Sequence, residues 1–500
     1  MTGESCPVAG LDADVLVVGA GPVGLMLAGE LRLGGASVIV VDRLAEPTGE
    51  SRAAQLNART AELFDQRDLL RRFPELERVP TGHFGGLGLR VDHCAGHLPG
   101  FWKVPQSVTE AVLAERAVEL GADLRRGVEL TGLRRCPGTG NVQADLAGGG
   151  ALRAAYVVGC DGGASTVRRS AGIGFPGIAA ERELLRADVA GIEVPDRRFE
   201  RHEGGLAIAN RRPDGVTRLM VHEFGVRPAD RRSAPDFAEV ADAWARVTGE
   251  NVSGGTPLWV DSFDDRSHQA EVYRRDRVLL AGDAAHVQLP AGGQALNLGL
   301  ADAVNLGWKL AAVVRGRAPE DVLDSYQAER LLEGARVLTN VRAQGLLLLG
   351  GPEVTAARAV FAEILAQPAA AGHVAEFVSG LAVRYPAAGG PPAGTALPRV
   401  ELATGEGPTD TVALLRRARW LLLDMTGAPS GTARPYWADQ VDHVPAKPQP
   451  GGVLDDIGAV LVRPDGHVAW CGDSLADPAL AETARTWFAR PSTHAQEEER

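Results

Sequence analysis

The sequence predicts an α/β protein with a Rossmann-like domain, an inserted mixed α+β domain and a small third domain at the C-terminal end. Three observations carry this prediction. A strand, a glycine-rich turn, a helix and a second strand follow one another near the N-terminus. Two later apolar strands also end in glycine-rich turns, and strand-like segments lie between them. With 500 residues, the chain also exceeds one ordinary hydrophobic core.

The first unit reads as a strand, a turn, a helix and a strand. Val15–Val18 form an apolar β-rich run, and residues 25–33 carry apolar side chains at helical spacing. Gly34 and Gly35 are expected to end the helix, and Val38–Val41 to form a second buried strand. This order is a βαβ unit, which opens an α/β domain.

The turn of this unit carries the spacing G-x-G-x-x-G, in which each glycine has a physical reason. Gly19 makes the turn, Gly21 lets a pyrophosphate reach the backbone at the helix N-terminus, and Gly24 lets helix and strand pack closely. Asp42 ends the second strand and can accept hydrogen bonds from a ribose diol, with Arg43 beside it. The pattern predicts a dinucleotide site but does not separate FAD from NAD(P).

The later elements follow in order along the chain. Residues 156–158 form an apolar strand before a helix predicted at 166–170, and "RVLLAGDAAHVQLP" repeats the strand-to-glycine pattern before a long amphipathic helix. Residues 184–279 look like strands of an antiparallel sheet. The stretch 385–398 is typical of a linker, and residues 396–490 are predicted to form a separate α/β domain.

Composition excludes several classes of function. The formal net charge is −12 and no basic block stands out, so we expect no nucleic-acid partner. Five widely spaced cysteines without a paired ligand pattern predict reduced thiols and no metal. No signal-peptide pattern opens the sequence, and its longest uncharged apolar segment is too short to span a membrane. We therefore expect a cytoplasmic protein without a membrane partner.

Several long motifs resemble the class A flavoprotein aromatic hydroxylases, which share the fold of p-hydroxybenzoate hydroxylase. The similarity is closest to the hydroxylases that tailor aromatic polyketides, notably the angucycline group. The motifs that carry it are "CDGGASTVRR", "LLAGDAAHVQLP", "GESRAAQLNARTAELFDQRDLL" (49–70), "TGHFGGL" (81–87), "VPQSVTEAVL" (104–113) and "PAGGQALNLGLADAVNLGWKL" (290–310). The resemblance covers essentially the whole chain.

The resemblance implies three domains. Residues 1–80, 105–183 and 280–395 would form the FAD-binding domain, and residues 81–104 and 184–279 the middle substrate-binding domain. Residues 396–500 would form a C-terminal thioredoxin-like domain, whose single Cys471 excludes dithiol chemistry within it.

It also implies roles for individual residues. Asp161 and Gly162 would lie near the flavin pyrophosphate, Asp283 would bind a ribityl hydroxyl, and Gly292 and Gly293 would let the backbone meet the isoalloxazine edge. Arg52 would lie beside the flavin at the mouth of the site, and Gln106 would contact the flavin or its ribityl chain. Asn297 would stand at the start of the helix whose dipole faces the N1–C2=O region of the flavin. His83, Phe84 and Pro290 would contact the substrate. Arg52, Pro290 and Asn297 are the residues expected to take part in catalysis.

The implied reaction is an FAD-dependent hydroxylation. NADPH or NADH binds transiently and reduces FAD, O2 adds at C4a, and an electron-rich phenol of a polycyclic aromatic polyketide attacks the hydroperoxide; cofactor chemistry dominates. The family loop usually has Gly-Met-Asn-Thr after the glutamine, whereas Ala295, Leu296, Asn297 and Leu298 stand here, so the exact reaction is less secure than FAD binding. A Baeyer–Villiger oxygenase of the same fold, or a flavin-bound partner protein without turnover, are the alternatives. The sequence leaves open whether the protein forms a homodimer.

Overall fold

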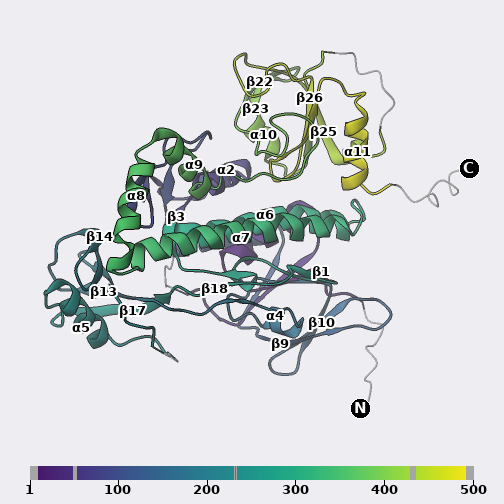
Figure 1. Cartoon of the computed structure of the whole chain (residues 1–500). Coiled ribbons are helices and arrows are strands. Elements are labelled where there is room, and N and C mark those ends of the chain that lie inside the picture. Colours follow the sequence, from purple (N-terminus) through teal and green to yellow (C-terminus); the bar gives the residue numbers. More distant parts are fainter. Residues whose placement is uncertain (1–9, 49–52, 230, 232, 428–434, 491–500) are drawn as a thin grey trace, which may run out of the picture.

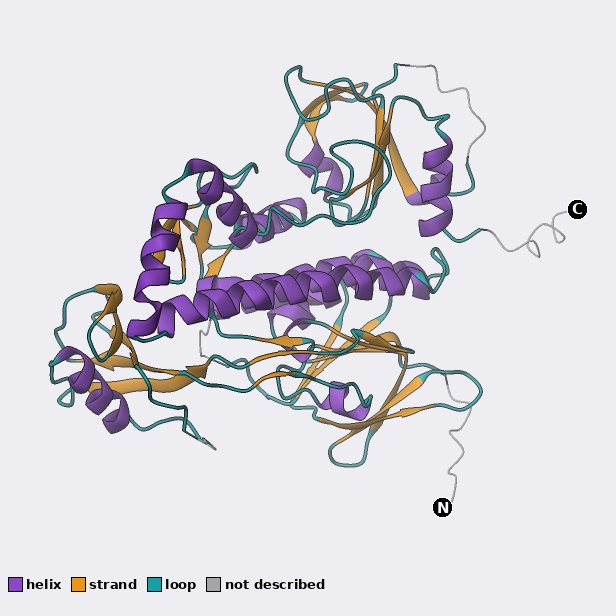
Figure 2. Ribbon diagram, in the orientation of Figure 1, coloured by secondary structure: helices purple, strands orange, loops and turns teal. Residues whose placement is uncertain are grey.

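The largest sheet combines parallel and antiparallel strands in a mixed α/β arrangement (Figures 1 and 2). The computed structural model describes residues 10–48, 53–229, 231, 233–427 and 435–490. The strands run in the order β19 (Arg274–Arg275), β20 (Val278–Leu280), β11 (Ala151–Gly159), β1 (Ala13–Val18), β2 (Val38–Asp42) and β8 (Asp123–Arg126), with β10 (Val142–Leu146) on β11 and β9 (Leu130–Arg135) on β10. β20, β11, β1, β2 and β8 are parallel.

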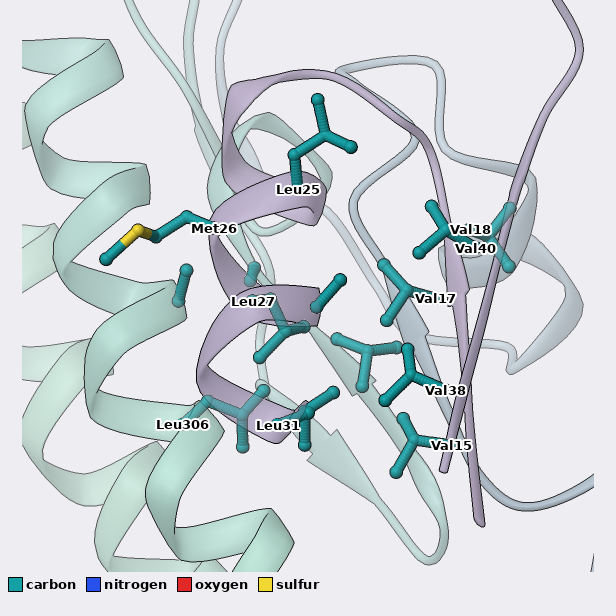
Figure 3. Packing of buried hydrophobic residues seen from close by; sticks show 14 of the residues in the cluster. Val15, Val17, Val18, Leu25, Met26, Leu27, Leu31, Val38, Val40 and Leu306 are labelled. Carbon is teal, nitrogen blue, oxygen red and sulfur yellow. The ribbon is translucent and has the colours of Figure 1, made fainter. Parts of the chain in front are cut away.

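The central parallel strands β1 and β2 are buried under helices, which explains their apolar, valine-rich sequences. Helix α1 (Pro22–Leu33) packs against α6 (Gln294–Val314) and α3 (Gln106–Glu119). In Figure 3, Val15 and Val17 of β1 face Leu27 and Leu31 of α1, and all four are fully buried. The predicted strands 15–18 and 38–41 and the helix ending at Gly34 are confirmed.

A second sheet has the antiparallel pairing expected between residues 184 and 279. Its order is β14 (Arg197–Arg201), β15 (Gly205–Arg211), β16 (Thr217–Glu223), β13 (Glu183–Ala190) and β17 (Thr256–Asp264). Helix α5 (Phe237–Thr248) covers one face, where its Trp244 is fully buried. The other face is left for the cavity described below.

Long helices and short sheets join these two sheets. Helix α7 (Val322–Leu349) runs beside α6, and α8 (Thr355–Leu365) and α9 (Pro368–Val378) follow it (Figure 1). The shorter elements are α2 (Ala58–Gln66), α4 (Thr166–Ser170), the sheet β3 (Gln55–Leu56)–β7 (Phe101–Lys103)–β4 (Glu77–Val79), the hairpin β5 (Thr81–Phe84)–β6 (Leu87–Arg90), and the sheet β12 (Gly177–Ile178)–β18 (Ser267–Gln269)–β21 (His286–Val287).

Among the described residues, no single helix has the length and apolar composition needed to cross a membrane. The bent pair Val322–Leu349 and Pro352–Leu365 passes that test only when the two helices are taken together.

The C-terminal part forms its own sheet, seen in yellow-green in Figure 1. Its order is β23 (Gly407–Asp410), β22 (Glu401–Thr404), β25 (Val441–Pro448), β24 (Trp420–Asp424), β26 (Ala459–Val462) and β27 (Val468–Gly472), with α10 (Thr411–Leu415) and α11 (Pro478–Trp487) beside it. The segment 385–398, for which the sequence suggests a linker, also contacts this sheet. Ala388 and Ala396 form β-bridges to Trp470 and His467, so this segment is bound to the C-terminal sheet.

Candidate active site

The three glycine-rich turns meet at one edge of the main sheet. β20, β11 and β1 are adjacent and parallel, so their carboxyl ends share an edge, and each of these ends leads into a glycine turn. This is the position where open α/β sheets bind ligands. The turns lie far apart in sequence, and the strand order brings them together.

The first turn has no room for side chains at two of its glycines. Gly19 has a φ of +106°, and a Cβ there would lie 2.3 Å from the carbonyl oxygen of Cys160. A Cβ on Gly24 would lie 2.0 Å from the carbonyl oxygen of Gly19. A Cβ on Gly21 would meet nothing within 4 Å, so packing within the protein does not explain this glycine. Open space at a helix N-terminus is what a pyrophosphate requires.

Asp42 is fixed at the end of β2 beside this turn. Its Oδ2 accepts a hydrogen bond of 2.7 Å from the backbone N–H of Ala20, and its Oδ1 accepts one of 2.8 Å from the N–H of Leu44. Each carboxylate oxygen keeps a second lone pair for a ribose hydroxyl. Together with Gly19, Gly21, Arg43 and Asp161, Asp42 lines a cavity of about 220 Å³.

Asp161, in the turn after β11, lines the same cavity. Its Oδ2 accepts hydrogen bonds from the backbone N–H groups of Thr166 and Val167, at 2.7 and 3.1 Å, at the start of α4. Its Oδ1 is buried and has no hydrogen-bond partner among the described residues. The next residue, Gly162, has a φ of +79°, which a side chain would disfavour. A buried oxygen without a partner, at the edge of a dinucleotide cavity, fits a hydroxyl-bearing cofactor.

The third turn packs against the first turn of α1. Gly282 has a φ of +64°, and a Cβ there would lie 3.0 Å from the side chain of Val23. The neighbouring Asp283 is exposed at this turn. Val23 of α1 thus packs against the turn at Gly282, while Asp283 is exposed on it.

The loop after Pro290 runs into the N-terminus of α6. Gly292 and Gly293 both have left-handed backbones, with φ values of +67° and +66°, and a Cβ on Gly293 would lie 2.5 Å from Nε2 of Gln55. Within the described part of the chain, no side chain caps the N-terminus of α6. Its first N–H groups and its positive dipole end can therefore face a ligand, as the family resemblance implies for a reduced flavin.

Asn297 lies in the first turn of α6, but its amide is bonded to the protein backbone. Its Oδ1 accepts a hydrogen bond of 2.9 Å from the N–H of Asn57, and its Nδ2 donates to the carbonyl of Gly293 at 2.7 Å. Asn297 is buried. These contacts give it a positioning role at this loop.

Gln106 holds the chain segment that follows Arg52. Its Oε1 accepts a hydrogen bond of 3.2 Å from the N–H of Ala53, and its own N–H donates to the carbonyl of Ala53 at 2.9 Å. Arg52 itself lies outside the described residues.

A second cavity of about 310 Å³ lies between this loop and the open face of the antiparallel sheet. Pro290, Gly292, Gly293, Ala295 and His83 line it. The remaining lining residues are largely apolar: Ala53, Ala54, Gln55, Leu184, Arg186, Phe199, Ile208, Met220, Phe263, Leu289, Ala291, Leu296, Leu348 and Leu349. Its volume and its lining are typical of a site for an apolar small molecule.

His83 faces this cavity as a neutral imidazole. Burial lowers the pKa of His83 to about 4, and the positive charge of Arg198 adds to that shift. The ring lies 4.3 Å, between centroids, from that of Phe199, and its Nδ1 accepts a hydrogen bond from the N–H of Gly86. The histidine therefore contributes a ring wall and not a positive charge near neutral pH.

Phe84, predicted to contact the substrate, lies in a different cluster from His83. Neighbouring residues of a strand point to opposite faces, so Phe84 in β5 turns away from the face that carries His83. Its ring packs 6.1 Å from that of Phe361, in a cluster with Phe101 and Leu347. Among the described residues that line the cavity, Phe84 is absent.

The sequence missed Arg186, which is the only arginine or lysine among the described lining residues. Its side chain is almost fully buried, and its guanidinium carbon lies 4.2 Å from the ring centroid of Trp259 and 5.5 Å from that of Phe263. Leu184 and Arg186 are two residues apart on β13 and so face the same side. The alternation of side chains along β13 could have indicated that Arg186 shares a face with Leu184. It does not indicate which face of the sheet meets the loop at Pro290.

Two family models match the chain. The model of a FAD binding domain matches residues 12–341, and the model of the C-terminal region of aromatic-ring hydroxylases matches residues 390–491. The chain is 40% identical to the 12-dehydrotetracycline 5-monooxygenase/anhydrotetracycline 6-monooxygenase of Streptomyces rimosus subsp. rimosus, over 96% of this chain and 99% of the relative.

Two solved structures are also similar over nearly the whole chain. CabE, an aromatic hydroxylase from angucycline biosynthesis, has a TM-score of 0.91 and 46% identity, and the match covers 96% of this chain and 100% of CabE. A Diels–Alderase of pyrroindomycin biosynthesis has a TM-score of 0.84 and 37% identity, with 95% and 99% of the two chains covered.

Proposed function

The chain belongs to the FAD-binding aromatic-ring hydroxylases, and from that premise we propose that it hydroxylates a polycyclic aromatic polyketide of the angucycline type. The proposal includes NADPH or NADH as the reductant and O2 as the co-substrate. The observation that supports it best is the apolar cavity between the Pro290 loop and the antiparallel sheet, because it can hold a flat ring system against the flavin site. The similarity to CabE over nearly the whole chain supports the angucycline class.

The finer architecture is part of this proposal. The main sheet with α1 and α6 would be the Rossmann-like FAD-binding domain, and the five-stranded antiparallel sheet the inserted substrate domain. The C-terminal sheet, with its parallel β24–β25 pair, would be the thioredoxin-like domain. The position of the cavity at the boundary of the first two supports this division, since ligand sites favour such boundaries.

Different residues would bind the ADP half and the flavin half of FAD. Gly21, Asp42 and Asp161 would hold the ADP half of FAD, and Asp283 its ribityl chain. The uncapped N-terminus of α6 would stabilise negative charge on the reduced isoalloxazine ring by about 0.3–1 kcal/mol. When bound, FAD supplies the redox and oxygen chemistry of the reaction, and the protein supplies position and a dry pocket.

The apolar cavity would place the reacting ring and exclude water. Pro290 and His83 would contact the substrate from two sides, with His83 as a neutral ring. Arg186 would face an oxygen-rich edge of the polycycle, because a guanidinium offers a fixed fork of donors to phenolate or carbonyl oxygens. Arg52 and Asn297 would act at the flavin, Asn297 through the backbone groups that it holds.

The experiment is turnover with a panel of fused-ring phenols. The purified protein should carry FAD, and an angucycline-type substrate should stimulate NADPH or NADH oxidation and gain one oxygen atom from labelled O2. A product with a new phenolic hydroxyl supports hydroxylation. A lactone carbonyl, or its hydrolysis to an acid, would instead show the Baeyer–Villiger outcome.

One observation favours a second candidate function. The similar Diels–Alderase covers almost the whole chain, so this fold also occurs in a protein named for a ring-forming reaction. A flavin-bound protein without redox turnover is therefore the alternative. In that case FAD would be retained, but no polyketide of the panel would stimulate oxidation of the nicotinamide.

A further inference from the structure

Asp302 is a fully buried carboxylate on α6 that holds the turn carrying Asp283. Its Oδ2 accepts a hydrogen bond of 3.1 Å from the backbone N–H of Gly282 and lies 2.7 Å from Nε2 of His286. Its Oδ1 accepts one of 2.7 Å from Nε of Arg330 on α7. A carboxylate with these partners is satisfied in spite of its burial, and the neighbouring charge of Arg330 helps to keep its pKa below the usual value.

Arg330 extends this contact to the first turns of α6. Besides Asp302, its guanidinium donates to the carbonyl of Leu298 at 3.2 Å and to the hydroxyl of Tyr385 at 3.0 Å. The side chain of Arg330 is 1% exposed and that of Asp302 is 0% exposed. Two buried residues therefore touch both the Gly282 turn and the backbone just after Asn297.

The Gly282 turn and helix α6 pack so closely that a small change in side-chain size between them would alter their distance. A Cβ on Gly299 would lie 3.1 Å from Cα of Gly282, so α6 and the turn are already in backbone contact there. Asp302 follows Gly299 by three residues, so both lie on the same helix face. Gly299 permits the close approach of α6 to the Gly282 turn, and the carboxylate of Asp302 holds the two segments at that distance.

We infer that Asp302 and Arg330 form a positioning pair that sets the spacing between the Asp283 turn and the N-terminus of α6. This inference rests on the proposed function, in which the turn binds the ribityl chain and the helix N-terminus faces the isoalloxazine ring. In that arrangement the pair would lie behind the segments that hold the flavin half of FAD, and Gly21 and Asp42 on other elements would hold the ADP half. Its loss should therefore weaken flavin binding and leave ADP binding unchanged.

The pair is also linked to the C-terminal sheet through Tyr385. The ring of Tyr385 lies 4.3 Å from that of His467 between centroids, and the guanidinium carbon of Arg463 lies 4.7 Å from its centroid. His467 and Arg463 flank the turn between β26 and β27, and both are buried. This contact provides a mild way to perturb the pair, because Tyr385→Phe removes one acceptor of Arg330 and leaves no unpaired charge.

The test compares FAD with ADP as ligands of the apoprotein, measured by calorimetry. In Asp302→Asn and Arg330→Lys we expect the Kd for FAD to rise at least tenfold and the Kd for ADP to stay within twofold. Tyr385→Phe should raise the Kd for FAD about threefold. The visible circular dichroism of bound flavin should change in all three variants, because it reports the setting of the ring.

Glu30→Gln is the matched control. Glu30 forms an equally buried pair with Arg67, with an Nε–Oε1 distance of 2.6 Å and 2% exposure of both side chains, but its partner does not touch the Gly282 turn. This variant should lower stability without changing the ratio of the two Kd values.

Two results would overturn the inference: an unchanged Kd for FAD in Arg330→Lys and Tyr385→Phe, or a parallel loss of FAD and ADP affinity. If Asp302→Asn does not fold, these two milder variants still decide. Failure of the proposed reaction would appear as absent turnover of a parent protein that binds FAD normally, so the two failures are distinguishable.

Discussion

Asn297 joins the first turn of α6 to the start of α2, because its Oδ1 accepts the backbone N–H of Asn57 at 2.9 Å. The two residues are 240 positions apart in the sequence. The same side chain donates to the carbonyl of Gly293 at 2.7 Å. One buried amide therefore connects the first turn of α6, the glycine loop before it and the start of α2.

Replacing Asn297 should destabilise the protein and its flavin loop. Asn297→Ala leaves a buried N–H and a buried carbonyl without partners, and each such loss costs about 1–3 kcal/mol. Asn297→Asp keeps the acceptor for Asn57 and loses the donor for Gly293, so it should recover part of the loss. Chemical denaturation of the apoprotein measures both. Equal stability of the alanine variant and the parent would contradict this role.

Asp283→Ala should weaken FAD retention about tenfold or more. A hydrogen bond to a charged group contributes about 1.5–3 kcal/mol, and the variant removes the carboxylate expected at a ribityl hydroxyl. FAD titration of the apoprotein measures the effect. Asp214→Ala is the control, since Asp214 is an exposed residue of the turn between β15 and β16. If both variants hold FAD as tightly as the parent, Asp283 does not bind the cofactor.

Arg52→Ala should retain FAD and lower turnover by roughly a hundredfold, the loss typical of removing one preorganised donor. This prediction comes from the family resemblance. Arg52→Lys keeps the charge but not the planar fork and should recover little. Steady-state kinetics with coupled product analysis checks it. Turnover close to that of the parent in Arg52→Ala would remove this residue from the catalytic set.

His83 should make the folded protein less stable in acid. Its pKa is about 4 in the folded state and about 6.5 when unfolded, so the folded state binds the proton less readily. The resulting stability is present above pH 6.5 and is lost as the pH falls toward 4, by at most about 3 kcal/mol. His83→Gln should flatten the decline of unfolding free energy across this range. An unchanged pH dependence would show that the imidazole is not held neutral.

Arg186→Met should raise KM for the polyketide about tenfold and leave FAD affinity unchanged. The guanidinium lies in the cavity wall, where its fork of donors would meet substrate oxygens, and Arg186→Lys should restore only part of the affinity. Phe84→Leu is the control, because it changes a packed cluster outside the cavity and should lower stability with KM unaffected. A KM effect in Phe84→Leu equal to that in Arg186→Met would argue for an indirect effect.

The local elements of the dinucleotide site could be predicted because their causes are local. Gly19, Gly292 and Gly293 require left-handed backbones, and a Cβ on Gly24 would clash with the nearby carbonyl oxygen of Gly19. Such demands act on a few neighbouring residues, so they leave a spacing that can be seen in the sequence. The strands at 15–18 and 38–41 have a similar origin, because a strand buried on both faces requires an unbroken apolar run.

The sequence by itself determined the three glycine turns, the strands that lead into them and the family to which they point. Only the tertiary structure decided which side chains meet. It placed His83 in the cavity wall and Phe84 in another cluster, brought Arg186 to the Pro290 loop, and joined Asp302 to Gly282 and Arg330. The physical reason is that these contacts depend on strand order and helix packing across long stretches of chain, and a local pattern does not record which face of one element meets another.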